Sequence, residues 1–184
     1  MRWSKPYADR VAKLRVPCGF VLVLTFAWLS RPTPASLLWG VPVSIAGLAL
    51  RAWAAGHLEK NTRLTWSGPY AFVRNPLYIG TLLVAAGLVI ASRRWILAGI
   101  FAAVFLFVYL PVIELEEQHL RDLFPEFATY AARVNKLIPR WPQSSAERRF
   151  RWSLYKRNRE YEAALGFVAG LAFLIAKILF TPGS

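Results

Sequence analysis

Five apolar stretches determine what this chain can fold into. A helix needs about 20 mostly apolar residues, within a range of roughly 17–25, to cross a bilayer. The second, fourth and fifth stretches meet this length, the third is at the short end, and the first is short unless it includes residues before Val16. We therefore predict an all-α, polytopic membrane protein with about five transmembrane helices. The stretches cover residues 16–30, 36–56, 76–92, 95–113 and 163–180.

Composition agrees with a membrane protein and excludes other classes. The 184 residues are 56% hydrophobic and carry 23 Lys and Arg against 10 Asp and Glu, a net charge of +13. Basic nucleic-acid-binding domains are not this apolar, and disordered basic tails lack aromatic residues. We therefore expect membrane lipids, and no nucleic acid, as partners. The single cysteine, Cys18, excludes an internal disulfide and a cysteine-rich metal site.

The distribution of charge predicts the orientation in the membrane. If the N-terminus is cytoplasmic, nineteen Lys and Arg residues and all ten acidic residues fall on the cytoplasmic side. Only Arg31, Arg93 and Arg94 fall outside, and Lys177 lies within the fifth stretch. Positive residues accumulate in cytoplasmic loops, so we predict a cytoplasmic N-terminus and an external C-terminus. The adjacent pair Arg93 and Arg94 is the exception.

The first stretch has an alternative interpretation as a cleaved signal peptide. Residues 1–15 are basic and an apolar run follows them, as in such a peptide. Pro32 and Pro34 stand where small residues would be needed for cleavage. We therefore favour a transmembrane helix.

Two helices are expected between the fourth and fifth stretches. Pro125 fits the first position of one helix, which Pro139 and Pro142 would end. Ser144 and Glu147 fit a capping box, so we expect a second helix from Ser144 through Glu160. Its mixture of basic and aromatic side chains suits an anionic membrane surface. The apolar face of the first helix would hold Phe127, Tyr130, Ala131, Val134 and Ile138.

These expectations divide the chain into three segments. Residues 1–56 would form an N-terminal transmembrane hairpin. Residues 57–142 would hold the functional core, made of a polar loop, a second hairpin and the first cytoplasmic helix. Residues 143–184 would add the basic interfacial helix and a C-terminal transmembrane helix.

A first motif spans residues 62–80, where the chain enters the third stretch. Gly68 begins a Gly-Pro turn signal, and Asn75 followed by Pro76 is typical of a helix N-cap with proline at the first helical position. Arg74 would lie beside the unpaired N–H groups of this helix start, which favour an anionic ligand. The alternative is a simple capped helix entry, which local spacing alone favours.

A second motif begins with three carboxylates at the cytoplasmic end of the fourth stretch. Glu114, Glu116 and Glu117 repel one another and lie at the negative end of a helix, which is unfavourable for them. A salt bridge from Glu117 to Arg121 would explain one of the three. Ionisable groups that break the local charge rule at a membrane boundary are candidates for function.

Pro111 should alter the fourth helix just before these carboxylates. Proline has no N–H group, so it frees the carbonyl of Phe107 and should kink the helix. A kink beside the carboxylates could open a cavity.

A metal centre is not supported by the spacing. His57, Glu59, His119 and the carboxylates could imitate a ligand set, but neither H-x-x-E-H nor H-E-x-x-H occurs. No arrangement for a nucleophilic serine or cysteine is supported either. We predict no metal.

Together the two motifs resemble the isoprenylcysteine carboxyl methyltransferase and phospholipid methyltransferase superfamily of integral membrane enzymes. The family's first motif, L-V-T-x-G-x-Y-x-x-x-R-H-P-x-Y-x-G, is similar to residues 64–80. Its second, E-E-x-x-L followed by Phe-Gly, Tyr and a terminal Ile-Pro, is similar to residues 116–139. The motifs occur in the family's order, each next to a predicted pair of spans.

The resemblance implies an S-adenosylmethionine-dependent methyltransferase with its active site on the cytoplasmic face. The cofactor pocket would lie between the third and fourth spans, beneath the loop helices. We predict catalytic roles for Arg74, Asn75 and Glu117. The cofactor-binding residues implied by position are His57, Thr62, Arg63, Leu64, Thr65, Tyr70, Asn75, Pro76, Leu77, Tyr78, Glu116 and Glu117.

The residue types agree with this cofactor. Glu116 could pair with its ammonium group, and Arg74 or the helix start at Pro76 could hold its carboxylate. Tyr70 or Tyr78 could pack on the adenine or the sulfonium. Methyl transfer needs positioning and exclusion of water more than a nucleophile. We expect a lipophilic acceptor, either a phospholipid-type amine or an isoprenylcysteine-type carboxylate.

Two positions depart from the family pattern. Asn75 replaces the usual histidine, although an amide can still hydrogen-bond the cofactor. Val112 stands where the prenylcysteine enzymes carry a substrate-binding arginine, which weakens the case for a carboxylate substrate. An amine acceptor would have to lose a proton, which Glu114 or Glu117 could accept.

Two other functions remain open. One is a membrane reductase that resembles the sterol reductases and uses NADPH, although the chain is short for that family. The other is a non-enzymatic transport or assembly protein, but few ionisable groups lie within the spans, so an ion pathway has little support. The sequence leaves the oligomeric state open.

Overall fold

Helices and connecting loops make up the structure, a computed structural model that describes residues 5–142 and 149–180. No strand occurs in these two ranges, which confirms the predicted all-α class. The elements are α1 (Lys5–Leu29), α2 (Pro34–Ala55), the 3-10 turn η1 (Gly68–Ala71), α3 (Pro76–Ser92), α4 (Trp95–Val104), the π-helical segment η2 (Phe105–Tyr109), α5 (Leu110–Leu123), α6 (Phe127–Arg133), α7 (Trp152–Arg157) and α8 (Tyr161–Phe180).

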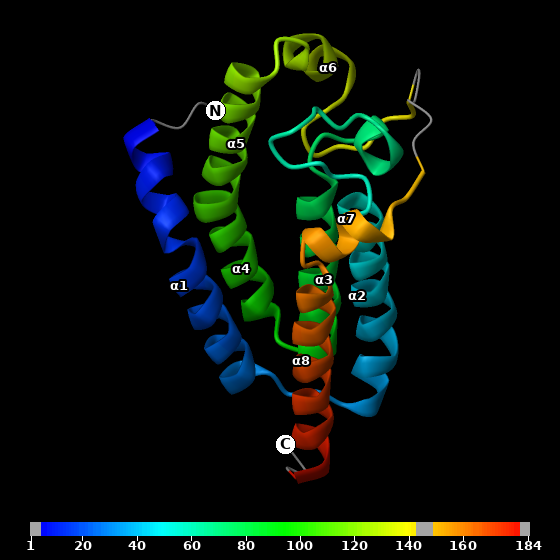
Figure 1. The fold of residues 1–184 in the computed structure, drawn as a ribbon. Coiled ribbons are helices and arrows are strands. Elements are labelled where there is room, and N and C mark those ends of the chain that lie inside the picture. Colours follow the sequence, from blue (N-terminus) through cyan, green and yellow to red (C-terminus); the bar gives the residue numbers. More distant parts are fainter. Residues whose placement is uncertain (1–4, 143–148, 181–184) are drawn as a thin grey trace.

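The long helices run beside one another, and α6 and the loop after α2 lie at one end of them (Figure 1). Three helices of the described chain are long and apolar enough to cross a membrane: α2, the continuous helix Trp95–Leu123 and α8. α1 adds a fourth if its two parts, which meet at 49°, form one span. α3 is apolar but has only 17 residues. The polytopic fold is confirmed, whereas the count of five spans stays a prediction.

Glycines let α2 and α3 pack with their backbones in close contact. A Cβ atom on Gly40 would lie 2.4 Å from the carbonyl oxygen of Gly87, and one on Gly47 would lie 2.6 Å from that of Gly80. Small residues allow this approach in membrane helices, where van der Waals packing replaces the hydrophobic effect. The two helices therefore form one rigid pair, and α3 carries part of the site at its first turn.

Serine hydroxyls add hydrogen bonds across the same pair. Ser44 Oγ donates to the carbonyl of Val84 (3.1 Å), and Ser36 Oγ donates to that of Ala91 (2.8 Å). Ser36 also belongs to a capping box with Thr33 at the start of α2. These bonds fix the register of α2 against α3.

The helix is π-helical just before Pro111, where the sequence predicts that the carbonyl of Phe107 is freed. η2 is π-helical, and the helix continues through it from Trp95 to Leu123. The hydroxyl of Tyr7, on α1, donates to the carbonyl oxygen of Phe107 at 2.9 Å. The carbonyl that proline cannot satisfy is therefore used to attach α1 to this helix.

The C-terminal end of α1 is closed by donors from later in the chain. The last carbonyls of a helix have no intrahelical partner. Arg94 Nε donates to the carbonyl of Leu29 (3.1 Å), and Lys177 Nζ donates to that of Ala27 (2.7 Å). Arg94, half of the arginine pair that broke the charge rule, is thus used inside the bundle.

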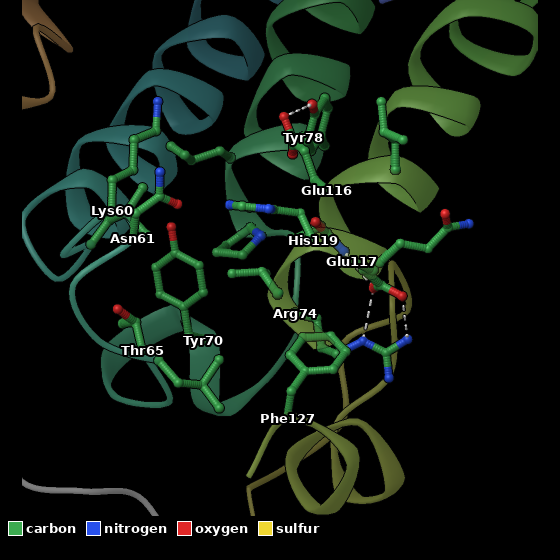
Figure 2. Close-up of a pocket in the computed structure, with 18 of the residues that line it drawn as sticks. Lys60, Asn61, Thr65, Tyr70, Arg74, Tyr78, Glu116, Glu117, His119 and Phe127 are labelled. Atoms are coloured by element: carbon green, nitrogen blue, oxygen red, sulfur yellow. Dashed lines mark hydrogen bonds and ion pairs between the residues drawn. The ribbon is translucent and has the colours of Figure 1, made fainter. Parts of the chain in front are cut away.

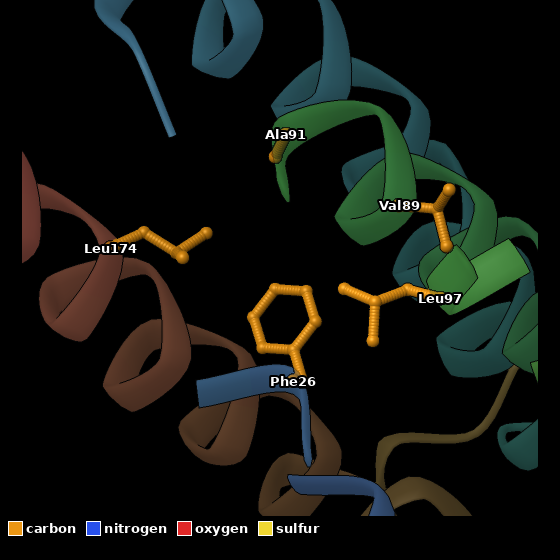
Figure 3. Close-up of a cluster of buried hydrophobic side chains, with 5 residues drawn as sticks. All are labelled: Phe26, Val89, Ala91, Leu97 and Leu174. Carbon is orange, nitrogen blue, oxygen red and sulfur yellow. The ribbon is translucent and has the colours of Figure 1, made fainter. Parts of the chain in front are cut away.

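A buried apolar cluster joins four helices near this end. Figure 3 shows Phe26 of α1 between Leu97 of α4 and Leu174 of α8, with Val89 and Ala91 of α3 beside them. Leu97 and Leu174 are each 1% exposed. The cluster anchors the bundle at the end opposite α6.

The first cytoplasmic helix is shorter than predicted. Phe127 and Tyr130 are buried as expected, but α6 ends at Arg133 and Ile138 is 73% exposed. The chain beyond α6 instead runs back towards the start of α3, where the backbone N–H of Arg74 donates to the carbonyl of Asn135 at 2.9 Å. The helix therefore ends before Pro139, where Arg74 and Asn75, just before α3, bond the carbonyls of the chain that follows it.

The prediction of a helix from Ser144 through Glu160 is wrong in its extent. The capping box of Ser144 and Glu147 lies outside the described residues. Within them, α7 begins only at Trp152 and ends at Arg157. Tertiary bonds to the end of α2, described below, set both of its ends.

Candidate functional site

A cavity of about 1060 Å³ lies where the two sequence motifs meet. Its walls come from the loop after α2, the first turns of α3, the end of α5 and α6 (Figure 2). Two residues of α1, Val16 and Gly19, also line it. Most of the predicted site residues line it. They are Arg63, Leu64, Thr65, Tyr70, Arg74, Asn75, Pro76, Leu77, Tyr78, Glu116 and Glu117.

Two predicted cofactor residues do not line the cavity. His57 is buried, its Nδ1 lies 2.9 Å from the carbonyl of Trp53, and its ring packs against Gly68. Thr62 is exposed, and its hydroxyl donates to the carbonyls of Glu59 and Lys60. Both residues shape the loop and do not face the space that the loop encloses.

The turn at Gly68 brings Tyr70 to the cavity. Gly68 has a φ of +57°, and a Cβ atom there would lie 2.8 Å from the ring of His57. Only glycine combines that backbone conformation with so close a neighbour. The predicted Gly-Pro turn is therefore confirmed, and it has a steric reason.

Tyr70 presents a buried hydroxyl group to the cavity. The residue is 7% exposed, and its hydroxyl has no hydrogen-bond partner among the described residues. Figure 2 shows the hydroxyl pointing towards Lys60 and Asn61. Burial, followed by the nearby Tyr130 and acidic groups, raises the pKa of Tyr70, so the group stays a neutral donor. An unsatisfied buried hydroxyl is costly unless a ligand pairs with it.

Arg74 and Glu117 form a buried ion pair at the centre of the site. Arg74 Nε and Nη2 lie 2.9 and 3.2 Å from the two carboxylate oxygens of Glu117. Arg74 Nη1 donates to the carbonyls of Ala131 and Val134 at 2.7 and 2.9 Å. Glu117 is 3% exposed. The structure therefore pairs Glu117 with Arg74 and not with Arg121, and all three guanidinium nitrogens of Arg74 have protein acceptors.

Asn75 belongs to the same network and does not cap its helix through its side chain. It occupies the N-cap position of α3, with Pro76 next, as predicted. Its Nδ2 group donates to Glu117 Oε1 and to the carbonyl of Lys136, both at 3.2 Å. Arg74, Asn75 and Glu117 thus hold one another, and their predicted catalytic role stays a prediction.

The other two carboxylates of the cluster have different environments. Glu114 pairs with Lys136 at 2.5 Å, and this lysine also lies 3.3 Å from Glu117. Glu116 is exposed, lines the cavity and accepts a hydrogen bond from the Tyr78 hydroxyl at 3.1 Å. Lys136 therefore neutralises part of the charge cluster, at Glu114 and Glu117, whereas Glu116 and Tyr78 face the cavity.

Several lining residues were missed by the sequence analysis. They include Lys60 and Asn61, which precede the first motif, and Arg51, which is held by Glu160. Lys60 is an exposed cation at the cavity, like the predicted Arg63. Asn61 has a φ of +55°. Asparagine tolerates that conformation better than most residues, so its place in a polar run was a usable turn signal.

The cavity has one polar and one apolar region. Lys60, Arg63 and Glu116 bring both signs of charge to the lining, and Val16 and Gly19 of α1, a helix that packs against α5, add apolar lining. Such a cavity suits a zwitterionic ligand next to an apolar one. In the described residues, no group of three or more His, Cys, Asp or Glu is placed to hold a metal ion.

Comparison with known proteins identifies the family. The model of the family described as "Phospholipid methyltransferase" matches residues 35–126, which is half of the chain. The chain is 34% identical over 141 residues to the cobalt-zinc-cadmium resistance protein CzcN of Cupriavidus metallidurans, covering 71% of this chain and 64% of that protein. It is 34% identical over 115 residues to the nickel-cobalt-cadmium resistance protein NccN of Alcaligenes xylosoxydans xylosoxydans, covering 61% of this chain and 53% of NccN.

The chain therefore matches less than two thirds of the length of either relative. No solved structure matches it. The apolar helices and the cavity at one end of them define an integral membrane protein with a cavity where its two sequence motifs meet. Since the family match spans both walls of that site, the chain belongs to the phospholipid methyltransferase family.

Proposed function

We propose that the protein is an integral membrane methyltransferase that uses S-adenosylmethionine and modifies a lipophilic acceptor from its cytoplasmic side. The observation that carries the proposal is the Tyr70 hydroxyl, which is buried, lacks a partner among the described residues and faces a large cavity. Small-molecule sites usually measure about 300–1,000 Å³. A cavity of about 1060 Å³ has room for a cofactor and the reactive end of an acceptor.

The lining residues fit the parts of this cofactor. Glu116 would pair with the ammonium group, and Lys60 and Arg63, which are exposed at the cavity, would hold the carboxylate. Arg74 is a poorer choice for the carboxylate because Glu117 and two carbonyls already occupy its guanidinium. Tyr70 would donate to the nucleoside. When bound, the cofactor would supply an electrophilic methyl group on its sulfonium.

The position of α1 supports a lipophilic acceptor. Val16 and Gly19, from a helix whose outer face is apolar, form one edge of the cavity beside Tyr109. An acceptor with an apolar tail could therefore lie against α1 while its polar end reaches the charged side.

An amine acceptor fits better than a carboxylate. Val112, which replaces the family's substrate-binding arginine, is 3% exposed and does not line the cavity. A buried carboxylate would need a cationic partner at that place. We therefore favour a phospholipid-type amine over an isoprenylcysteine-type carboxylate. Glu114 and Glu117, the predicted proton acceptors, are both held by Lys136, so we assign them a structural role. The ammonium proton of the acceptor would then pass to water before the free amine attacks the methyl group.

Calorimetric titration of the purified protein in detergent with S-adenosylhomocysteine tests cofactor use. We expect saturable binding, and binding of NADPH in its place would contradict the proposal. Supplying methyl-labelled S-adenosylmethionine to membranes that contain the protein tests the acceptor. Label should appear in the lipid extract, and label confined to a water-soluble product would exclude a lipophilic acceptor.

Substitution of Tyr70 by Phe separates binding from folding. The variant loses one hydrogen bond to the ligand, so affinity for S-adenosylhomocysteine should fall about two- to tenfold. Stability without ligand should stay equal or rise, because an unsatisfied buried hydroxyl is removed. Tyr7→Phe is the matched control: it removes the bond to Phe107 and should lower stability without changing affinity. Equal affinity in Tyr70→Phe and the wild type would remove Tyr70 from the site.

A further inference from the structure

The segment Phe150–Glu160, here called the C-terminal clasp, contacts the cavity loop although it lies beyond the family match at residues 35–126. It contains α7 and leads into α8. Figure 1 shows α7 crossing beside the upper ends of α2 and α3, below the loop that walls the cavity. The ring of Phe150 occupies the space beside Gly56, where a Cβ atom would lie 2.1 Å from it.

The clasp satisfies the carbonyls where α2 ends and the cavity loop begins. The backbone N–H of Arg151 donates to the carbonyl of Gly56 at 3.0 Å. Asn158 Nδ2 lies 2.9 Å from the carbonyls of both Ala55 and Leu58. Carbonyls at a helix end need such partners. Arg151 Nη1 also lies 2.8 Å from Glu59 Oε1. Donors from the clasp thus fix the path of the chain into the loop at 58–65, whose residues except Thr62 line the cavity.

An ion pair joins the clasp to the other wall of the cavity. Arg51 Nε and Nη2 lie 2.5 and 3.1 Å from the carboxylate of Glu160, which is 8% exposed. Arg51 Nη1 donates to Thr81 Oγ1 at 2.5 Å and to the Leu77 carbonyl at 3.3 Å. Leu77 and Thr81 line the cavity on the first turns of α3. Bidentate pairing of this kind fixes geometry as well as charge.

The Arg51–Glu160 pair also acts electrostatically on Tyr70, which lines the cavity. The Glu160 carboxylate contributes to the raised pKa of Tyr70, after burial and Tyr130, and the Arg51 guanidinium opposes it. Arg51 has protein acceptors for all three of its guanidinium nitrogens, so its role is to hold α3 and the clasp together.

We propose that the C-terminal clasp is a positioning element of the ligand site, with Asn158 and Glu160 as its positioning residues. It holds the cavity loop and the first turns of α3 in the shape that binds the cofactor, and it does so without touching the ligand. The part of this inference that concerns cofactor affinity rests on the proposed function. The part that concerns the loop does not.

Two variants and one matched control test the proposal. Glu160→Gln removes the charge that holds Arg51, and Asn158→Ala removes the two loop bonds. Glu162→Gln is the control, because Glu162 is 51% exposed and pairs with Arg159 one turn away. Hydrogen exchange of the ligand-free protein should rise at residues 55–66 in both variants and not in the control. Affinity for S-adenosylhomocysteine should fall about tenfold, as for outer-shell partners of metal ligands, and Glu160→Asp should restore part of it.

The outcomes are distinguishable. Unchanged exchange at residues 55–66 in both variants would overturn the proposal, and so would faster exchange with wild-type affinity, because the segment would then only anchor α8. If the wild type itself does not bind S-adenosylhomocysteine, the proposed function fails, while faster exchange in the two variants would still support the holding of the loop.

Discussion

Neighbouring glutamates on α5 show how strongly local environment separates residues of one type. Glu117 is 3% exposed and is bonded by Arg74, Asn75 and Lys136. Glu116 is exposed at the cavity beside Tyr78. The first holds α3, α5 and the chain after α6 together, whereas the second lines the cavity.

Substituting these two residues should therefore give opposite results. Glu117→Gln leaves the buried Arg74 without its counter-charge, so the free energy of unfolding should fall by about 3–5 kcal/mol. Glu116→Gln should leave unfolding nearly unchanged and weaken S-adenosylhomocysteine binding about ten- to a hundredfold, the cost of a charge-assisted hydrogen bond. Thermal unfolding measures the stability of each variant, and calorimetric titration in the same detergent measures its affinity for S-adenosylhomocysteine. A destabilised Glu116→Gln with wild-type affinity would reverse these assignments.

At this scale, the sequence predicted which residues meet but not what they bind. The resemblance to the methyltransferase family implied that Tyr70, Asn75 and Glu116 line one pocket, and all three line the cavity. The partners of Arg74 were not predictable, because the carbonyls of Ala131 and Val134 reach it only through a chain reversal after α6. Arg51 had no motif at all, and its partner lies 109 positions away.

Among the elements, the glycines between α2 and α3 decide how the site is supported. Gly87→Ala should destabilise the protein by about 1–3 kcal/mol, because the new Cβ atom would lie 2.2 Å from Ser44 Oγ and 2.4 Å from the Gly40 carbonyl. Gly99→Ala is the matched control on α4, where a Cβ atom meets nothing within 4 Å. Thermal unfolding in detergent compares the two, and an equal effect would show that the helices are not packed this closely.

Helix positions were easier to predict than helix ends. Apolar runs located the long helices because burial in lipid depends on the sequence of each helix alone. The ends of α6 and α7 depend on distant carbonyl and guanidinium groups, so Pro139 and the charge-rich run before Trp152 were misleading.

For the whole molecule, the orientation in the membrane is the property to measure. α1 begins and α8 ends at opposite ends of the bundle (Figure 1), and the basic residues predict that α6 is cytoplasmic. In a Cys18→Ser background, Ala128→Cys on α6 should react with an impermeant thiol reagent only after the cells are opened. Arg93→Cys, at the other end, should react in intact cells. Labelling of both from one side would contradict the orientation.

The capping of α1 by Lys177 has a consequence for synthesis on the ribosome. Lys177 and its acceptor Ala27 are 150 positions apart, so α1 enters the bilayer long before its final donor has been translated. Until then, the open carbonyls must be hydrated, which keeps that end of α1 at the bilayer surface and the helix loosely attached. The end of α1 therefore gains its Lys177 donor only when α8 has been made.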